Sequence, residues 1–465
     1  MRSFFRPLFS SKPVQIRATP KPITPFGGQI SFICFLEKIG LVHELIAAIP
    51  FVLTSTNAIP PAQTLIAFIC AVVVGAKRFA HADWLRHDKV LHEMLALKRF
   101  PGTDTIRNFF LRFTQADIET SWRRLWKWVL PHFLMPPHGF SLDLDSTVFQ
   151  RSGNQQGAKK GYNPKRPGRN SHHPLLAVLA EAHCVLHAWL RSGNTASGSG
   201  VIAFLKEALS LTPAGWVIRC IRADSGFFDQ GLFSFLEERS IAYIVVAKMT
   251  TQVKRRAAGK MHWKRIDGTF SVGHFFAKLY GWDRKRRFIV IRERVQESEK
   301  KKRRDRRRLG QMIFDIPAYT YRVFVTNRPD DGVVIWRDYN QRAVVEQRIE
   351  EIKTEMHADG FCLKDFYATE SAFLATLFTF NLLSLYQKAI DPQAKYQQPS
   401  TLRASIFLGG AILGGGGRKK AVILSEAWGG LKKHIPLIET VLAWVKPTSP
   451  KFVLRGWKRL IKCPT

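Results

Sequence analysis

Acidic side chains are scarce in this chain of 465 residues, where 36 Asp and Glu stand against 71 Lys and Arg. The formal net charge is therefore +35. Such an excess of positive charge repels itself unless a polyanion neutralises it, so nucleic acid is the first partner to consider and an anionic membrane surface is the rival. With 46% hydrophobic residues, the chain is long enough to bury the cores of two or three domains, and its composition argues against disorder.

Cysteine is also sparse. The six cysteines are scattered along the chain, and no two of them form a Cys-x2-Cys pair. This spacing argues against a structural zinc site and against a disulfide framework. The thiols are expected to be buried or spare, in a reducing cytoplasm.

Long apolar runs are missing. The best one, Thr64 to Ala76, is too short to span a bilayer and leads directly into Lys77 and Arg78. The run from residue 371 to 386 is interrupted by polar side chains, which suits a buried helix better, and the N-terminus lacks the apolar segment of a signal peptide. We therefore expect no membrane partner.

Hydrophobic periodicity indicates two kinds of structure. Residues from about 31 to 135 have helical spacing, and a turn at 101–105 precedes a basic helix from Ile106, as in either a helix-turn-helix or an ordinary helical domain. From Phe140 to Asp145, apolar and polar residues alternate, which predicts a half-buried strand. Strands are then expected at 174–180, 185–190, 216–221 and 241–247, with helices at 201–209 and 232–238. This order predicts a mixed α/β sheet whose first strands are antiparallel.

One further segment, residues 339–353, has the composition of a helix, without Gly or Pro. At 100° per residue, Arg342, Glu346 and Lys353 lie within about 60° of Tyr339, on one narrow face. A carboxylate between two cations and a phenol is suited to holding a metal ion beside a phosphate. Alternatively, Glu346 is a solvated i,i+4 partner of Arg342, and Glu350 competes with it for the role of ligand.

Two aspartates are placed where α/β proteins build sites. Asp145 lies near the end of the predicted strand from Phe140, and Asp224 follows another apolar run. Together with Glu346 they offer three acids from distant segments, a set that can hold two divalent cations about 4 Å apart. Each aspartate precedes a serine, so either could instead cap a turn.

The chain resembles a known family at these residues. Tyr339, Arg342, Glu346 and Lys353 fit the spacing Tyr-x2-Arg-x3-Glu-x6-Lys of bacterial insertion-sequence transposases, which carry a DDE triad on an RNase H-like fold. The resemblance covers roughly residues 80 to 390 and is closest to the branch with a β-rich insertion between the second Asp and the Glu. Its other matching segments are 142–147, 161–165, 171–174, 190–194 and 222–227.

The resemblance implies a function and roles for single residues. It identifies Asp145, in preference to Asp143, together with Asp224 and Glu346, as catalytic acids that hold two Mg²⁺ ions, for which Mn²⁺ can substitute. It assigns phosphate contacts to Tyr339, Arg342 and Lys353. The implied protein is a bacterial, cytoplasmic, nucleoid-associated transposase that binds double-stranded DNA at transposon ends and at the target. Because this mechanism holds two ends together, we expect a homodimer on DNA.

The implied domain organisation has six parts. They are a basic, Pro-rich arm (1–30), a helical DNA-binding domain (31–135), the first part of the RNase H-like core (136–247), a β-rich basic insertion (248–318), the second part of the core with the catalytic Glu (319–391) and a C-terminal region (392–465).

Two basic segments are candidates for binding DNA directly. A loop with Tyr162, Lys165, Arg166 and Arg169 mixes cations with an aromatic ring, as backbone-tracking loops do, although a solvated loop has the same composition. The run from 300 to 308 is a candidate phosphate clamp or a plain charged loop. Two other functions stay open, a hydrolytic nuclease of the same fold and a non-catalytic DNA-binding protein derived from a transposase.

Overall fold

The computed structural model describes residues 2–294, 315–316, 319–391, 395–415, 420–427 and 431–443. The basic run at 300–308 lies outside these residues, as do parts of the predicted insertion and of the C-terminal region.

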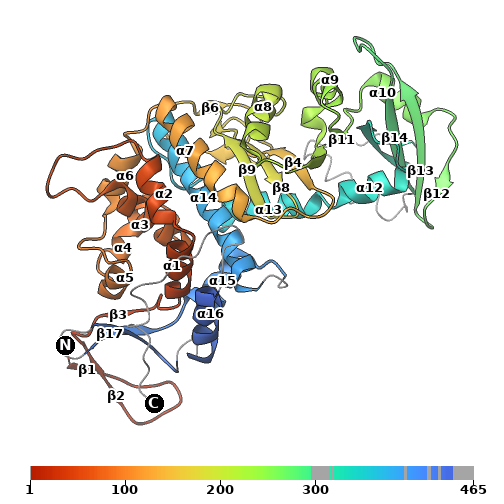
Figure 1. Ribbon diagram of the computed structural model, residues 1–465. Coiled ribbons are helices and arrows are strands. Elements are labelled where there is room, and N and C mark those ends of the chain that lie inside the picture. The colour runs from red at the N-terminus through yellow and green to blue at the C-terminus, as the bar shows by residue number, and fades with distance from the viewer. Residues whose placement is uncertain are drawn as a thin grey trace.

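Residues 29–129 are mainly helical, as the periodicity over about 31–135 predicts. Figure 1 shows these helices at one end of the molecule, with α7 running alongside α14 towards the sheet. Helix α7 begins with a capping box, in which Thr114 and Asp117 each bond the other's backbone amide. The helices are α1 (Gln29–Lys38), α2 (Leu41–Ala48), α3 (Pro61–Val73), α4 (Ala82–Leu85), α5 (Lys89–Met94), α6 (Thr103–Phe110) and α7 (Gln115–Val129).

Ten strands form one mixed sheet at the other end (Figure 1). The order is β12-β13-β14-β16-β11-β10-β4-β8-β9, and β15 also pairs with β16. The strands are β4 (Phe140–Ser146), β8 (Leu175–Leu179), β9 (Cys184–Trp189), β10 (Ile218–Ala223), β11 (Ala242–Val246), β12 (Lys264–Arg265), β13 (Phe270–Ala277), β14 (Arg286–Arg294), β15 (Asp315–Ile316) and β16 (Tyr319–Thr326).

Within this sheet, β4, β8 and β9 form an antiparallel meander, whereas β10 runs parallel to both of its neighbours, β4 and β11. The mixed α/β sheet with antiparallel first strands is therefore confirmed. Strands β12, β13 and β14, from the predicted insertion, extend the same sheet beyond β16. The helices that connect the later strands are α8 (Val201–Leu211), α9 (Gln230–Glu238) and α10 (Thr251–Ala258).

Smaller elements complete the described residues. They are the ribbon of β1 (Arg2–Phe5) and β2 (Val14–Arg17), the sheet of β3 (Ile23–Thr24), β17 (Ala411–Gly414) and β18 (Ala421–Leu424), the sheet of β5 (Phe149–Gln150), β6 (Lys159–Lys160) and β7 (Asn170–His172), and the helices α12 (Gly332–Asn340), α13 (Ala343–Thr354), α14 (Phe366–Ile390), α15 (Pro399–Leu402) and α16 (Leu431–Ala443).

The longest helix, α14 (Phe366–Ile390), is the central helix of the core. Its 25 residues are long and apolar enough to cross a membrane, but 94% of its most apolar window is buried inside the protein. Phe373, Phe378 and Tyr386 join the main core cluster, which includes side chains from both the N-terminal helices and the sheet. Burial of apolar area against protein on all sides explains its composition, so we interpret α14 as a core helix.

One polar residue of α14 bonds the backbone of the outermost strand β9. The Asn381 side chain is fully buried and bonds both backbone groups of Val185 on the edge strand β9, accepting from its N–H at 2.8 Å and donating to its C=O at 2.8 Å. The amide thus takes the place that a neighbouring strand would occupy. Without it, a buried N–H would have no partner.

We predict that Asn381→Leu, which keeps the side-chain volume but removes both bonds, lowers the free energy of unfolding by about 2–4 kcal/mol. The measurement is urea denaturation followed by circular dichroism. The matched control is Thr376→Val on the same helix, because the Thr376 hydroxyl bonds only the carbonyl of Ala372, one turn away. The control is expected to cost less than about 1 kcal/mol. Equal losses in the two variants would show that Asn381 does not stabilise the sheet edge.

Candidate active site

The parallel pairing of β4 and β10 places two acids side by side at the carboxyl ends of these two strands. Ala223 pairs with Leu144 in this register. Asp145 follows Leu144, and Asp224 follows Ala223. The two aspartates are therefore neighbours at the carboxyl ends of adjacent parallel strands, where open α/β sheets place their sites. Their carboxylates interact electrostatically, since Asp224 is one of the groups that raise the pKa of Asp145.

Asp143, two residues earlier on the same face of β4, is not available for such a site. It is fully buried and forms a two-point ion pair with Arg222 of β10, with both N–O distances at 2.7 Å. A buried carboxylate with both oxygens bound to a guanidinium serves structure. The arrangement supports the choice of Asp145 over Asp143.

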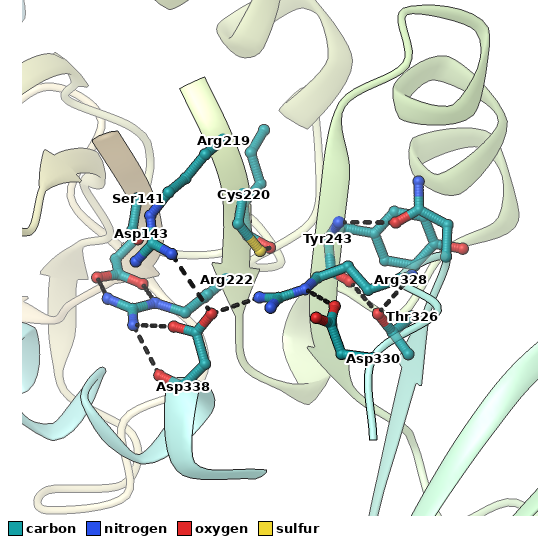
Figure 2. A network of polar contacts seen from close by, with 12 residues as sticks. Ser141, Asp143, Arg219, Cys220, Arg222, Tyr243, Thr326, Arg328, Asp330 and Asp338 are labelled. Atoms are coloured by element: carbon teal, nitrogen blue, oxygen red, sulfur yellow. Dashed lines mark hydrogen bonds and ion pairs between the residues drawn. The ribbon is translucent and has the colours of Figure 1, made fainter. Parts of the chain in front are cut away.

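The ion pair continues into a network across the sheet (Figure 2). Arg222 also donates to the backbone carbonyl of Asp338 at 2.7 Å and to its carboxylate at 3.0 Å. The other carboxylate oxygen of Asp338 bonds Arg328, which reaches Asp330 at 2.8 Å. Because Asp338 lies at the end of α12, this network fixes that helix end to strands β4 and β10.

Sequence reasoning missed this network. Asp143 and Arg222 are 79 residues apart, and Arg222 and Asp338 are 116 residues apart, so no local spacing connects them. The available signal was Arg222, between the apolar residues Ile221 and Ala223, because a charge buried there requires a partner.

The predicted helix over 339–353 is interrupted in the structure. α12 ends at Asn340 and α13 begins at Ala343, so Tyr339 lies on the first helix, and Glu346 and Lys353 lie on the second. The prediction of one continuous helix is therefore wrong. Helix propensity favours continuity, but the anchored end of α12 and the buried side chain of Arg342 between the two helices determine the break.

Arg342 occupies the centre of the candidate site. Its guanidinium donates to Glu346 Oε1 at 2.8 Å, lies 3.3 Å from Asp145 Oδ1, and donates to the carbonyl of Leu144 at 3.1 Å. Only 3% of the Arg342 side chain is exposed. Asp224 also favours the charged form of Arg342 electrostatically. Asp145 and Glu346 thus contact one buried cation, and Asp224 follows the strand next to that of Asp145. Glu346 itself is 63% exposed.

Burial raises the pKa of Asp145 from its ordinary value to about 6. The nearby cation of Arg342 opposes this rise, while the negative charges of Asp224 and Glu346 add to it. A nearby positive charge strongly stabilises the charged form of such a buried carboxylate.

The donor chemistry of the three acids fits a hard divalent cation, because all three present carboxylate oxygens. No group of three or more His, Cys, Asp or Glu side chains is arranged as a metal site among the residues that the structure describes. Two of the three acids, Asp145 and Glu346, instead form ion pairs with Arg342.

Asp224 also caps the turn that follows β10. Its Oδ1 accepts the Gly226 N–H at 2.9 Å, and Asp145 Oδ1 likewise accepts the Ser146 N–H at 2.8 Å. A Cβ at Gly226 would lie 2.7 Å from the Cβ of Ser197, so only glycine fits. The turn-cap role and the clustering of acids are therefore both present, and the first does not exclude the second.

The segment 190–194 holds in place the loop that packs against the turn after β10. Buried Arg191 donates from one nitrogen to the carbonyls of Ala196, Ser197 and Ser199, at 3.3, 3.1 and 2.9 Å. The Ser197 hydroxyl is 2.8 Å from that of Ser146, beside Asp145. This accounts physically for an arginine in that segment.

Two other predicted residues border the site. Tyr339 packs its ring against Phe324, with ring centroids 4.7 Å apart, and its hydroxyl has no hydrogen-bond partner in the described part of the chain. Burial raises the pKa of Tyr339 to about 12, and Asp224 and Glu346 add to this rise. Lys353 donates to the carbonyl of Val148 at 2.9 Å, just beyond β4.

The basic loop is exposed, and in the sequence it follows soon after β4, the strand that carries Asp145. Tyr162, Lys165, Arg166 and Arg169 are all exposed, between β6 and β7. Strand β7 pairs with β5, which begins four residues after Asp145. His172, on β7, is buried and bonds Arg151 and the carbonyl of Gln156, as a structural histidine does.

Comparison with known proteins adds a family. A structure of the piggyBac transposase synaptic complex with hairpin DNA is similar to the chain over 84% of this chain and 83% of that one, with 12% identity and a TM-score of 0.44. No curated protein sequence matches. A family model described as "Transposase DDE domain group 1" matches residues 6–439. The chain therefore belongs to the transposase DDE domain group 1 family.

Proposed function

We propose that the protein is an RNase H-like DDE transposase of a bacterial insertion sequence, which binds the terminal inverted repeats, cleaves the DNA at the element ends and joins it to a target. The observation that carries this proposal is the contact of Asp145 and Glu346, from distant segments, with Arg342, together with the position of Asp224 on the strand end next to Asp145. The RNase H-like assignment is supported by the antiparallel meander β4-β8-β9 followed by the parallel strands β10 and β11.

Asp145, Asp224 and Glu346 are the proposed ligands of two Mg²⁺ ions, for which Mn²⁺ can substitute. When bound, such ions activate the attacking oxygen and stabilise the leaving oxygen of a phosphodiester. Arg342 has the proposed role of exchanging its carboxylate partners for a DNA phosphate, since a guanidinium grips phosphate at two points. This exchange releases Glu346, whose exposed side chain is free to turn towards the two aspartates.

Tyr339 and Lys353 are the proposed further contacts with phosphates at the transposon end. The unpartnered hydroxyl of Tyr339 supports this role, as does the position of Lys353 beside the loop after β4. Tyr162, Lys165, Arg166 and Arg169 would follow the DNA backbone next to the site. Their exposure, with the net charge of +35, supports binding of a polyanion.

The remaining assignments complete the proposal. The helical region 31–135 would recognise the inverted repeats, and two copies would hold the two ends together, so that the protein acts on DNA as a homodimer. The location is the bacterial cytoplasm, in association with the nucleoid. The buried state of α14 fits a protein without a membrane partner.

We predict that Asp145→Asn, Asp224→Asn and Glu346→Gln each lower cleavage and strand transfer by more than about a hundredfold, because each removes part of the charge that holds the ions. Gel assays with element-end DNA, intact or pre-cleaved, measure the two reactions. DNA affinity is expected to stay within about threefold, since the phosphate contacts remain.

Glu350→Gln is the matched control, an exposed acid one turn further along α13. Its activity is expected to equal that of the wild type. Cleavage and joining that persist unchanged in the three acid variants would show that these acids do not catalyse them. DNA binding without any cleavage by the wild type would leave a non-catalytic DNA-binding protein. Cleavage of intact ends, with no joined product from pre-cleaved ends, would identify a nuclease.

Metal binding gives a second readout that does not depend on turnover. We predict that Mn²⁺, followed by electron paramagnetic resonance, binds the wild type and is displaced by Mg²⁺. Asp145→Asn and Asp224→Asn are expected to weaken this binding by about tenfold or more, because each takes away a charged oxygen ligand. Equal Mn²⁺ affinity in all three proteins would place the ions elsewhere.

The basic loop is tested through the salt dependence of DNA binding. We predict that changing Lys165, Arg166 and Arg169 together to Ala lowers the slope of log affinity against log salt concentration by up to about three, since each lost phosphate contact removes about one unit. Fluorescence anisotropy measures this slope. Lys206→Ala, an exposed cation on α8, is the control and is expected to leave the slope unchanged. An unaltered slope in the triple variant would show that the loop does not touch DNA.

A further inference from the structure

A cavity outside the candidate active site lies between α7, α8, β9 and the beginning of α14. Its volume is about 470 Å³, within the range of pockets that bind small molecules. None of the residues around Arg342 lines it. Figure 1 shows α7 and α14 side by side here, with α8 above β9. The site is therefore separate from the one proposed to act on DNA.

The cavity is acidic in a strongly basic protein. Glu119, Glu207 and Glu370 line it, and Arg123 is the single Lys or Arg among its lining residues. The negative charges of Glu119 and Glu207 raise the pKa of Glu370, so the three carboxylates interact electrostatically. An excess of negative charge repels phosphate, which excludes DNA as the occupant and favours a cation.

Glu370 is the carboxylate with the most to gain from a cation. Its Oε1 accepts the Leu190 N–H at 3.0 Å, while its Oε2 has no hydrogen-bond partner in the described part of the chain. Burial is the main cause that raises the pKa of Glu370 to about 7, ahead of the charges of Glu119 and Glu207. A half-buried acid that lines a cavity, with one oxygen lacking a partner among the described residues, is only partly satisfied.

The other walls are aromatic. Trp122, Trp126 and Trp189 line the cavity, with Phe366 and Tyr367 at the start of α14. The indole N–H groups already donate to Ser371, to the carbonyl of Val185 and to Glu207, at 3.1, 2.9 and 2.8 Å. The rings therefore offer no free donors to a ligand. Ring faces beside carboxylates are the surroundings in which proteins bind organic cations.

We propose that this cavity binds a primary ammonium group on an apolar stem, with the ammonium at Glu370 and the stem along the tryptophan rings. The same chemistry occurs in free aliphatic diamines and in lysine side chains. Both carry a compact charge that a carboxylate can hold and methylene groups that apolar walls can cover.

Calorimetric titration of the full chain with 1,5-diaminopentane tests the proposal, with Nα-acetyl-lysine amide as the second ligand and 1,5-pentanediol as the uncharged control. We expect saturable binding of both amines and none of the diol. Tighter binding of the diamine assigns the site to small molecules, and tighter binding of the lysine derivative assigns it to a protein side chain. Failure of both amines to bind, or equal binding of the diol, overturns the proposal.

Two variants locate the binding. Glu370→Gln is expected to weaken it by about tenfold or more, because the charge at the free oxygen is lost. Glu238→Gln removes an exposed acid on α9 that does not line the cavity, and it is expected to bind as the wild type does. Equal affinity in wild type and Glu370→Gln, with both folded by circular dichroism, overturns the proposal.

The pH dependence of the wild type gives an answer even if Glu370→Gln does not fold. The amines remain charged between about pH 8 and about pH 5.5, whereas Glu370 becomes protonated on the way down through its raised pKa. His187 of β9, and Glu119 and Arg123 of α7, also face the cavity, as does Glu207 of α8. Loss of negative charge from the cavity weakens its attraction for an ammonium group. Binding is therefore expected to weaken at lower pH, and affinity that stays constant or rises overturns the proposal.

Discussion

The buried ion pair between Asp143 and Arg222 is the constraint on which the candidate active site depends. It joins β4 and β10, the two strands that carry Asp145 and Asp224, and extends through Arg222 to the end of α12. Two charges without solvent tolerate little displacement, since losing either partner leaves an uncompensated charge in the core. The network therefore fixes the two aspartates and the helix break before Arg342 relative to one another.

Within that frame, Arg342 provides positive charge next to the acids. Its guanidinium is almost fully buried, and two carboxylates and a backbone carbonyl accept from it or lie beside it. Asp145 needs such a charge because it is enclosed, whereas Glu346 is mostly in solvent and contributes less to the balance. One guanidinium thus offsets only part of the negative charge of the three acids, and further positive charge is needed to balance it.

Much of the fold and of the site could be predicted from the sequence because the signals were local. Alternating residues 140–145 indicated β4, and apolar runs indicated the strands from β8 to β11, each within a few residues of its observed bounds. The carboxyl ends of strands correctly indicated where Asp145 and Asp224 would meet. Polar interruptions correctly identified α14 as a buried helix.

What the sequence could not provide were contacts between distant segments. Helix propensity does not register the anchoring of Asp338 by Arg222, so the break at Arg342 was missed. Nor does any local pattern show that β12, β13 and β14 continue the main sheet, because strand pairing is determined by long-range packing. The same holds for the cavity at Glu370, whose walls come from four separate elements.

The side-chain amide of Asn381 affects whether the outermost strand β9 can pair with a strand of another molecule. Open sheets tend to recruit strands from neighbouring copies and grow into aggregates. At β9 this is blocked at Val185, whose two backbone groups are already taken. At the opposite margin, β12 is only the exposed pair Lys264–Arg265, so like charges would confront each other. Each border of the main sheet therefore carries a feature that opposes pairing with a further strand.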